Sequence, residues 1–345
     1  MLYYLDNFQS TAEGFRPGGK KAAKNANNNA ANNGAKNKAS GLNENYAREL
    51  MELHTLGVDG GYSQQDVTEL ARMLTGWTYD QRALIRSNET FRFDSARHDN
   101  GTKHWLGREV AAAGVAEGDM ALEVLAHHPA TAHRISYKLA QYFVQDEPNA
   151  ALVERMARVY LASDGDIGSV LRVLFASSAF LAPDAAGAKF KTPYQFVISA
   201  ARASATPVAN VAPLLTAMAQ LGMPLYGCQT PDGYKNTEQA WLNPDALTRR
   251  IGFATALASG RLPLANRPAA APALPAPALG EMMVAGAPAT MAPATPAPPA
   301  RPLDAARLQD TLGAAISPRT RGAVAASAEP LRAAMLLGSP DFMQR

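Results

Sequence analysis

The chain has 345 residues, of which 47% are hydrophobic, and 33 lysines and arginines against 30 aspartates and glutamates give a formal net charge of +3. This length can form one large domain or two ordinary ones with a substantial core. The small and scattered positive charge argues against a nucleic-acid-binding protein. A single cysteine, Cys228, excludes an internal disulfide framework and a zinc site built from several cysteines.

Two segments have compositions that are typical of chain outside a packed core. Residues 16–40 are dominated by Asn, Ala, Lys and Gly, so we expect a disordered loop. Residues 263–303 are rich in Pro and Ala, which predicts an extended linker inserted before further helices. No run of about 18 apolar residues is present, so a membrane-spanning helix is not expected.

The remaining sequence predicts an all-α fold, with one multi-helix domain and a small hairpin or ordered loop. Apolar residues recur three and four positions apart through residues 41–262, which we take as the helical core domain. Helices are predicted over 193–203, 211–221 and 244–258, and another begins at Pro129. Residues 304–345 again show a helical pattern, and we expect them to pack back on the core.

A short non-helical stretch, ETFRFDSARHDNGTKHWLG, interrupts these helices. Phe91 and Phe93 alternate with polar residues, as in a strand. Asn100-Gly101 is a turn pair, so a short hairpin or ordered loop is predicted around it.

The stretch GLNENYARELMELHTLG, residues 41–57, concentrates charged side chains on one predicted helix. With the apolar face centred on Tyr46, Leu50 and Leu53, Glu49 lies roughly 60° to one side and His54 roughly 80° to the other. Both therefore border the core, and we expect both to be buried with partners elsewhere in the fold. Glu44 and Arg48 lie opposite and should face water. The loop from Arg97 to Lys103 offers possible partners for Glu49, namely Arg97, His98 and Lys103.

Spacing on this helix excludes one kind of site and leaves another open. Metal pairs on helices sit three or four residues apart, whereas Glu49 and His54 are five apart and Glu52 and His54 are two apart. Glu49 and Glu52 are three apart, so a pair of carboxylates for acid–base chemistry is possible. Exposed ion pairing of a capped amphipathic helix is the commoner outcome for such a pattern.

A second candidate is the loop RHDNGTKHW, in which His98 and Asp99 are adjacent. A histidine held by a carboxylate can serve as a general base or a metal ligand. Neighbouring residues of an extended chain point to opposite sides, so a mutual contact is not required. The alternative is a polar turn in which Asp99 and Asn100 bond the backbone.

Other polar residues point to structure rather than chemistry. His127, His128 and His133 lie at a helix junction, where capping or packing explains them. No phosphate-binding loop, nucleophile elbow or dinucleotide fingerprint is present. Cys228 precedes a turn and has no specific partner in sequence.

Several of these strings resemble one bacterial family, the domain of unknown function 1800. The resemblance rests on GLNENYARELMELHTLGVDGGYSQQDVTELARMLTGW, FRFDSARHDNGTKHWLG, HPATAHRISYKLAQYFV, DGDIGSVLRVLFASSAF, KFKTPYQFVISAAR, EQAWLNPDAL and the closing LLGSPDFMQR. It covers nearly the whole chain outside residues 16–40 and 263–303. The family loop after His98-Asp99 normally lacks a second histidine, so His104 receives no family role.

The resemblance implies a mostly helical domain, often in exported bacterial proteins, although these residues show no signal peptide. It also implies that family members have a longer N-terminal portion. Residues 1–15 are therefore expected to be the remnant of a truncated N-terminal portion. Members are often encoded beside a sulfatase-like companion family numbered 1501. No reaction, cofactor or metal follows from the resemblance.

Two classes of function therefore stay open. In the first, the chain is an exported or envelope-associated hydrolase-like protein, with Glu49, Glu52, His54, His98 and Asp99 as candidate catalytic residues in one cleft. In the second, it is a non-enzymatic binding or assembly partner of the sulfatase-like companion. Convergence of those five side chains in a concave pocket would favour the enzyme, and dispersal would favour the binding protein.

Overall fold

The structure is a computed structural model that describes residues 1–15, 41–265 and 301–345. The predicted loop 16–40 and residues 266–300 of the predicted linker lie outside the described residues. The all-α fold class is confirmed, with two small antiparallel strand pairs among the helices. Every helix of the described residues is too short or too polar to cross a membrane.

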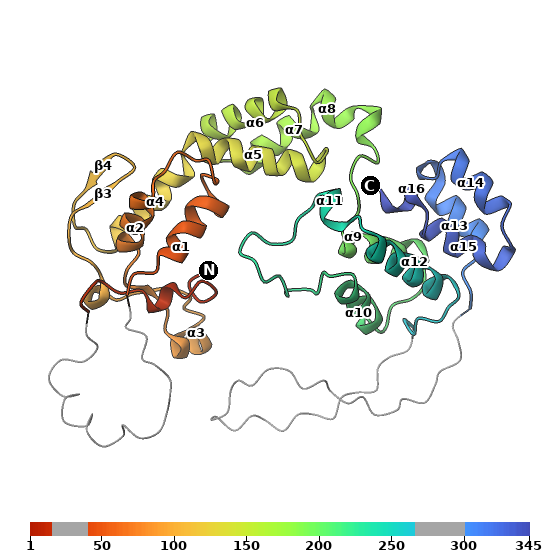
Figure 1. The fold of residues 1–345 in the computed structure, drawn as a ribbon, viewed down its shortest axis with the longest axis horizontal. Coiled ribbons are helices and arrows are strands. Elements are labelled where there is room, and N and C mark those ends of the chain that lie inside the picture. Colours follow the sequence, from red (N-terminus) through yellow and green to blue (C-terminus); the bar gives the residue numbers. More distant parts are fainter. Residues whose placement is uncertain (16–40, 266–300) are drawn as a thin grey trace, which may run out of the picture. The chain divides into compact units, whose positions relative to one another are not determined.

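The chain divides into two compact units, coloured along the sequence in Figure 1. Unit 1 comprises residues 1–140 and 149–177, and unit 2 comprises residues 141–148 and 178–345. The domain boundaries suggested by composition stay a prediction.

Unit 1 holds the elements of the first half of the chain. Its helices and strands are α1 (Glu44–Glu49), a π-helical turn (Leu50–His54), α2 (Gln64–Met73), β1 (Trp77–Thr78), α3 (Gln81–Ser87), β2 (Arg92–Phe93), β3 (Lys103–Trp105), β4 (Arg108–Val110), α4 (Val115–Ala126), α5 (Pro129–Phe143), α6 (Ala150–Ala162) and α7 (Ile167–Phe175). Short 3-10 turns lie at Asn7–Gln9 and Ser95–Arg97.

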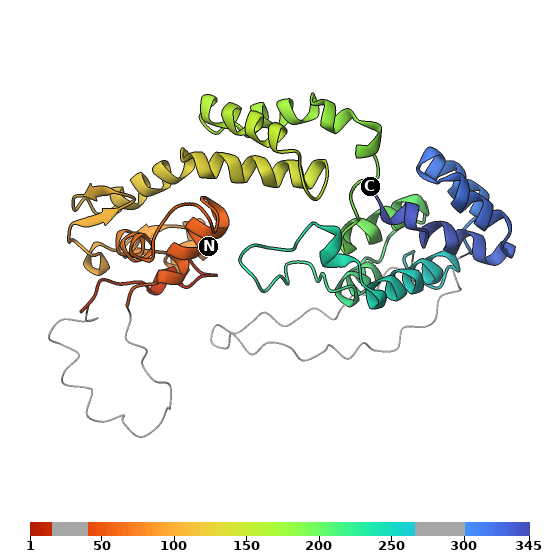
Figure 2. The same ribbon diagram turned by 45° about the horizontal axis from the view of Figure 1, so that its top comes forward.

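The core of unit 1 forms where α1, α2 and α4 meet the two strand pairs. α2 packs against α1, β3 and α4. Its apolar residues Leu70 and Met73 are fully buried, and so is Trp105 of β3. α6 and α7 pack side by side (Figures 1 and 2).

Residues 1–15 are joined to this core by hydrogen bonds. The side chain of Asn7, which is buried, donates to the carbonyl oxygens of Leu74 and Trp77, each at 3.2 Å. The N–H of Ala12 donates to the carbonyl oxygen of Arg97 at 2.8 Å. The N-terminal stretch is thus held at the end of α2, beside the loop that carries His98 and Asp99.

The predicted hairpin is present, but its turn is not the predicted one. β3 pairs with β4 through Leu106-Gly107, and both turn residues have positive φ, 46° and 73°. Asn100-Gly101 lies before β3 instead. Leucine seldom adopts positive φ, and here its N–H donates to Asp66 Oδ1 of α2 at 2.7 Å. A contact from α2, which is distant in sequence, therefore stabilises a turn that the local sequence does not predict.

Unit 2 contains α8 (Ser178–Leu181), α9 (Pro193–Ala203), α10 (Ala212–Gln220), α11 (Glu238–Trp241), α12 (Pro244–Ala258), α13 (Ala305–Leu312), α14 (Pro318–Ala325), α15 (Glu329–Leu337) and α16 (Pro340–Met343). α12 packs along α15, and α13 contacts both α9 and α15. Leu264, within the predicted linker, is fully buried in the core of this unit.

Candidate functional site

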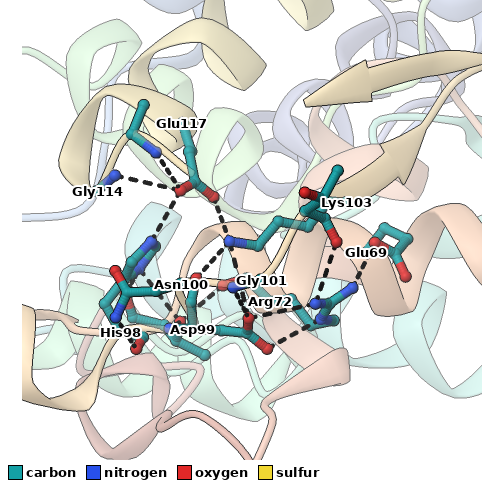
Figure 3. A network of polar contacts seen from close by, with 12 residues as sticks. Glu69, Arg72, His98, Asp99, Asn100, Gly101, Lys103, Gly114 and Glu117 are labelled. Carbon is teal, nitrogen blue, oxygen red and sulfur yellow. Dashed lines mark hydrogen bonds and ion pairs between the residues drawn. The ribbon is translucent and has the colours of Figure 1, made fainter. Parts of the chain in front are cut away.

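His98 and Asp99 lie on the loop between β2 and β3, which local side-chain bonds shape. Asp94 caps the 3-10 turn before it by accepting from the N–H of Ala96. Asp99 Oδ1 accepts from the N–H of Gly101 at 2.8 Å. The expected polar turn is therefore real, and it leaves His98 and Asp99 pointing toward different partners (Figure 3).

Asp99 pairs with an arginine of α2. Arg72 Nε lies 2.9 Å from Asp99 Oδ2, and Arg72 Nη2 lies 3.2 Å from Oδ1. Arg72 Nη1 also pairs with Glu69 at 2.8 Å. Burial alone would raise the pKa of Asp99, but the bonds from Arg72 and the Gly101 N–H outweigh it and hold that pKa below its usual range. Asp99 is thus a stable anion rather than a proton donor.

His98 is buried and bonds through both ring nitrogens. Nδ1 lies 2.9 Å from the carbonyl oxygen of Thr75, and Nε2 lies 3.0 Å from Glu117 Oε1. A carbonyl oxygen can only accept, so Nδ1 donates. Glu117 Oε1 also accepts from the N–H groups of Ala113 and Gly114, at 2.8 and 3.2 Å. Both ring nitrogens of His98 are therefore engaged, Nδ1 by the backbone and Nε2 by Glu117.

Lys103 brings a cation to the same carboxylate. Its Nζ lies 2.6 Å from Glu117 Oε2 and donates to the carbonyl oxygen of Asp99. Neither Lys103 nor Glu117 has an exposed side chain. Burial would raise the pKa of Glu117, but bonds from Lys103, the Ala113 N–H and His98 prevail, so its pKa lies below the ordinary value.

We call His98, Asp99, Lys103, Glu117 and Arg72 the buried network (Figure 3). It joins α2, the β2–β3 loop, β3 and the first turn of α4. Its groups bond one another and the backbone, and three of its five side chains are buried. Such an arrangement can fix elements in place, but it offers a substrate no open position.

The other sequence-predicted candidates lie on α1 and the π turn. Glu49 and Glu52 are half-buried and His54 is exposed. The pKa of His54 is lowered, mainly because the ring is partly desolvated. The nearby positive charges of Arg134, Lys138 and the N-terminus lower it further. The structure therefore brings His98 and Asp99 into one network, in which neither Glu52 nor His54 takes part.

The predicted burial of Glu49 and His54 is wrong. The buried stripe of α1 and the π turn runs through Tyr46, Ala47, Leu50 and Met51, not through Leu53, which is half-buried. The centre of the buried face lies further toward Ala47 and Met51 than predicted, which turns Glu49 away from the core. His54 is the last residue of the π turn, where the 100° spacing of an α-helix no longer applies.

The predicted exposure of Glu44 and Arg48 is wrong as well, because both are half-buried. Each bonds Gln64 at the start of α2, Arg48 at 2.6 Å and Glu44 at 2.8 Å. These two residues therefore link α1 to α2.

Sequence reasoning missed Glu117 as a member of the network. It assigned Lys103 as a possible partner of Glu49, whereas Lys103 pairs with Glu117. One signal was available: Gly114 precedes Glu117 by three residues, the spacing of a capping box, and Glu117 does accept the backbone N–H of Gly114. Nothing local connects that helix start with His98.

Among the described residues, no three His, Cys, Asp or Glu side chains gather as a metal site would require. Cavities do occur in unit 2. One of about 590 Å³ lies between α10 and α12, and another of about 350 Å³ lies between α12, α14 and α15. None of the five predicted catalytic residues lines these cavities.

Comparison with known families gives one result. The sequence model of the family described as "Protein of unknown function (DUF1800)" matches residues 1–344, so the chain belongs to this family. Neither the curated proteins nor the solved structures contain a match to the chain.

Proposed function

We propose that this member of the DUF1800 family is a non-enzymatic binding or assembly protein. The observation that carries the proposal is the buried network, in which the most promising acid–base residue, His98, is 3% exposed and bonded at both ring nitrogens. General acid–base catalysis needs a group within reach of a substrate proton. His98 instead stabilises the junction of α2 with α4.

The partner proposed for this function is the sulfatase-like companion that the family resemblance suggests, in an exported or envelope setting. The rival proposal, an exported hydrolase-like protein, would have to use the carboxylates and imidazole that remain accessible on α1 and the π turn. Glu49, Glu52 and His54 are the predicted candidates among those residues. His54 is exposed and the two glutamates are half-buried, so replacements of similar size should keep the fold.

One set of variants in the full-length protein of the native host separates the two proposals. Glu49→Gln, Glu52→Gln and His54→Gln remove acid–base chemistry while nearly keeping side-chain size. Glu44→Gln on the same helix is the matched control. Host phenotype, capture of the companion protein and thermal midpoint are measured for each variant.

The binding proposal expects the three variants to match Glu44→Gln in phenotype and in capture of the companion. Loss of phenotype with an unchanged thermal midpoint and unchanged capture would overturn it in favour of the hydrolase. Failure of the unaltered protein to capture the companion would reject that partner.

A further inference from the structure

The 350 Å³ cavity of unit 2 has a mainly apolar wall, in which Thr255, Thr320 and Ser339 are the polar lining residues. It lies between α12, α14 and α15, within the size range of small-molecule sites. Ile251 of α12 and Leu331 of α15 line it and are 51% and 54% exposed, so apolar surface continues from the cavity to the solvent.

The hydroxyl groups in the cavity wall are already bonded. Thr255 Oγ1 donates to the carbonyl oxygen of Ile251, and Ser339 Oγ donates to that of Leu336, each at 2.8 Å. Thr320 Oγ1 lies 3.4 Å from Ser317 Oγ. The wall therefore presents few free polar groups to an occupant, and burial of hydrocarbon is the chemistry that it favours.

Arginines flank this apolar wall. Thr320, Ala323 and Val324 of α14 line the cavity, and a helical turn of about 100° per residue places Arg319 and Arg321 on the two sides of that stripe. Arg332 similarly flanks the lining residue Leu331 on α15.

Arginines outnumber carboxylates around the cavity. Within the described residues, Arg319, Arg321 and Arg332 form no ion pair with a carboxylate, although Arg321 and Arg332 bond backbone carbonyls. The nearest acidic residue on α15, Glu329, falls about 160° from Leu331 and so points away. Asp341 of α16 follows the lining residue Pro340, and its carboxylate accepts from the N–H and Oγ of Ser317, each at 2.7 Å, and from Thr320. The three arginines therefore outnumber this carboxylate beside the cavity.

We propose that this cavity binds the alkyl chain of an anionic amphiphile, with its carboxylate or phosphate head group held by the flanking arginines. The chain would bury its methylenes against the wall, which removes hydrocarbon surface from water. Arginine is suited to carboxylate and phosphate because its planar donors match both. This site is separate from the proposed partner binding and does not depend on it.

The test measures binding of dodecanoate, below its micelle concentration, to the full chain by isothermal titration calorimetry. Dodecyltrimethylammonium has the same alkyl chain with a positive head, and dodecanol has a neutral one. We expect dodecanoate to bind at least tenfold more tightly than the cationic probe, with dodecanol between them. Equal affinities for the two charged probes would overturn the role of the arginines.

Two tryptophan variants locate the binding. Ala323 and Ala325 are both exposed on α14, but only Ala323 lines the cavity. Ala323→Trp should reduce dodecanoate affinity at least tenfold by filling the space, and Ala325→Trp should leave it unchanged. If both variants bind dodecanoate like the parent, the cavity is not the site.

Charge reversal tests the head-group contacts. Arg319→Glu combined with Arg321→Glu should remove the preference for dodecanoate over dodecyltrimethylammonium. Two other exposed arginines, Arg202 on α9 and Arg307 on α13, provide the matched double reversal, which should retain the preference. Loss of the preference in both double variants would show a general charge effect and overturn the proposal.

Vesicles distinguish the two sources of such a ligand. Sedimentation with phosphatidylglycerol vesicles, compared with phosphatidylcholine vesicles, reports capture of a lipid from a bilayer. Binding of free dodecanoate without sedimentation assigns the site to a soluble carboxylate. Sedimentation that Ala323→Trp abolishes assigns it to a membrane lipid, and either result supports an anionic amphiphile.

Discussion

Lys103 Nζ lies 2.6 Å from Glu117 Oε2, and neither side chain has any exposed surface. The pair joins β3 to the first turn of α4, and both of these elements pack against α2. A buried carboxylate that loses its cation leaves a charge in a low-dielectric interior, which is a large cost.

Replacement of Lys103 should therefore be strongly destabilising. Lys103→Met keeps much of the apolar stem but removes the ammonium group that pairs with Glu117, and we expect the free energy of unfolding to fall by about 3–5 kcal/mol. Denaturation in urea measures it. The control is Lys235→Met, in an exposed pair with Asp232, with an expected effect of less than about 1 kcal/mol.

The double variant with Glu117→Gln should recover part of that loss, because a neutral amide requires no cation. Equal effects of Lys103→Met and Lys235→Met would show that the buried pair does not hold β3 to α4.

Acid should weaken unit 1 through Glu117. The pKa of Glu117 in the folded protein lies below its ordinary value of 4.5, so the unfolded chain binds more protons as the pH falls. Its contribution to stability is fully present above about pH 4.5 and is lost as the pH drops through the folded-state pKa.

Glu117→Gln should be less stable than the parent at pH 7 and should lose less stability between pH 7 and pH 3. Urea denaturation of both proteins across that range measures the difference. If both proteins lose the same free energy of unfolding between pH 7 and pH 3, Glu117 is not the group responsible for the loss.

Two helical glycines should respond oppositely to alanine. A Cβ at Gly118 of α4 would lie 2.2 Å from Trp77 Cζ2, whereas a Cβ at Gly322 of α14 would meet no atom within 4 Å. Gly118→Ala should lower the free energy of unfolding by about 1–3 kcal/mol through overpacking. Gly322→Ala should raise it by about 0.5–1 kcal/mol through helix propensity. Thermal melts of both variants provide the comparison, and the same sign of change for both would refute it.

Helix positions could be predicted where the signals are local. The predicted ranges 193–203 and 244–258 agree with α9 and α12, because each helix begins with a proline preceded by a capping residue, Thr192 or Asn243. Ser63 and Asp66 likewise form a capping box at the start of α2. These features need only neighbours in sequence.

The site could be predicted only in part. His98 and Asp99 stood out as a polar pair, but their actual partners, Glu117 and Arg72, lie on two different helices. Glu117 reads as an ordinary acidic residue in the first turn of a helix. Its role depends on packing between elements, which periodicity does not encode.

Stability of unit 2 should rise at alkaline pH because of Lys191. Its Nζ donates to the carbonyl oxygen of Phe342 at 2.6 Å and lies 3.8 Å from the centre of the Phe342 ring. Burial, with the nearby cation Arg250, lowers the pKa of Lys191 from 10.5 to about 8. The folded state thus favours the neutral amine more than the unfolded state does.

The sign of the pH effect follows from proton binding. Below pH 8 both states hold the proton, and the folded state carries the full penalty of a buried charge. Between about pH 8 and 10.5 the unfolded chain binds more protons than the folded one, so the free energy of unfolding increases with pH. Lys191→Met should remove this increase and should not be less stable than the parent at pH 7.

Lys191→Arg is the informative companion variant. Arginine cannot release its proton in this range, so it should also lose the increase while keeping the penalty at every pH. Urea denaturation at pH 7 and pH 10 measures all three proteins. The difference in free energy of unfolding between parent and variant, taken at each pH, removes the contribution of other groups that titrate between pH 7 and pH 10. If Lys191→Met keeps the parental rise, the rise belongs to another group and the deduced state of Lys191 is incorrect.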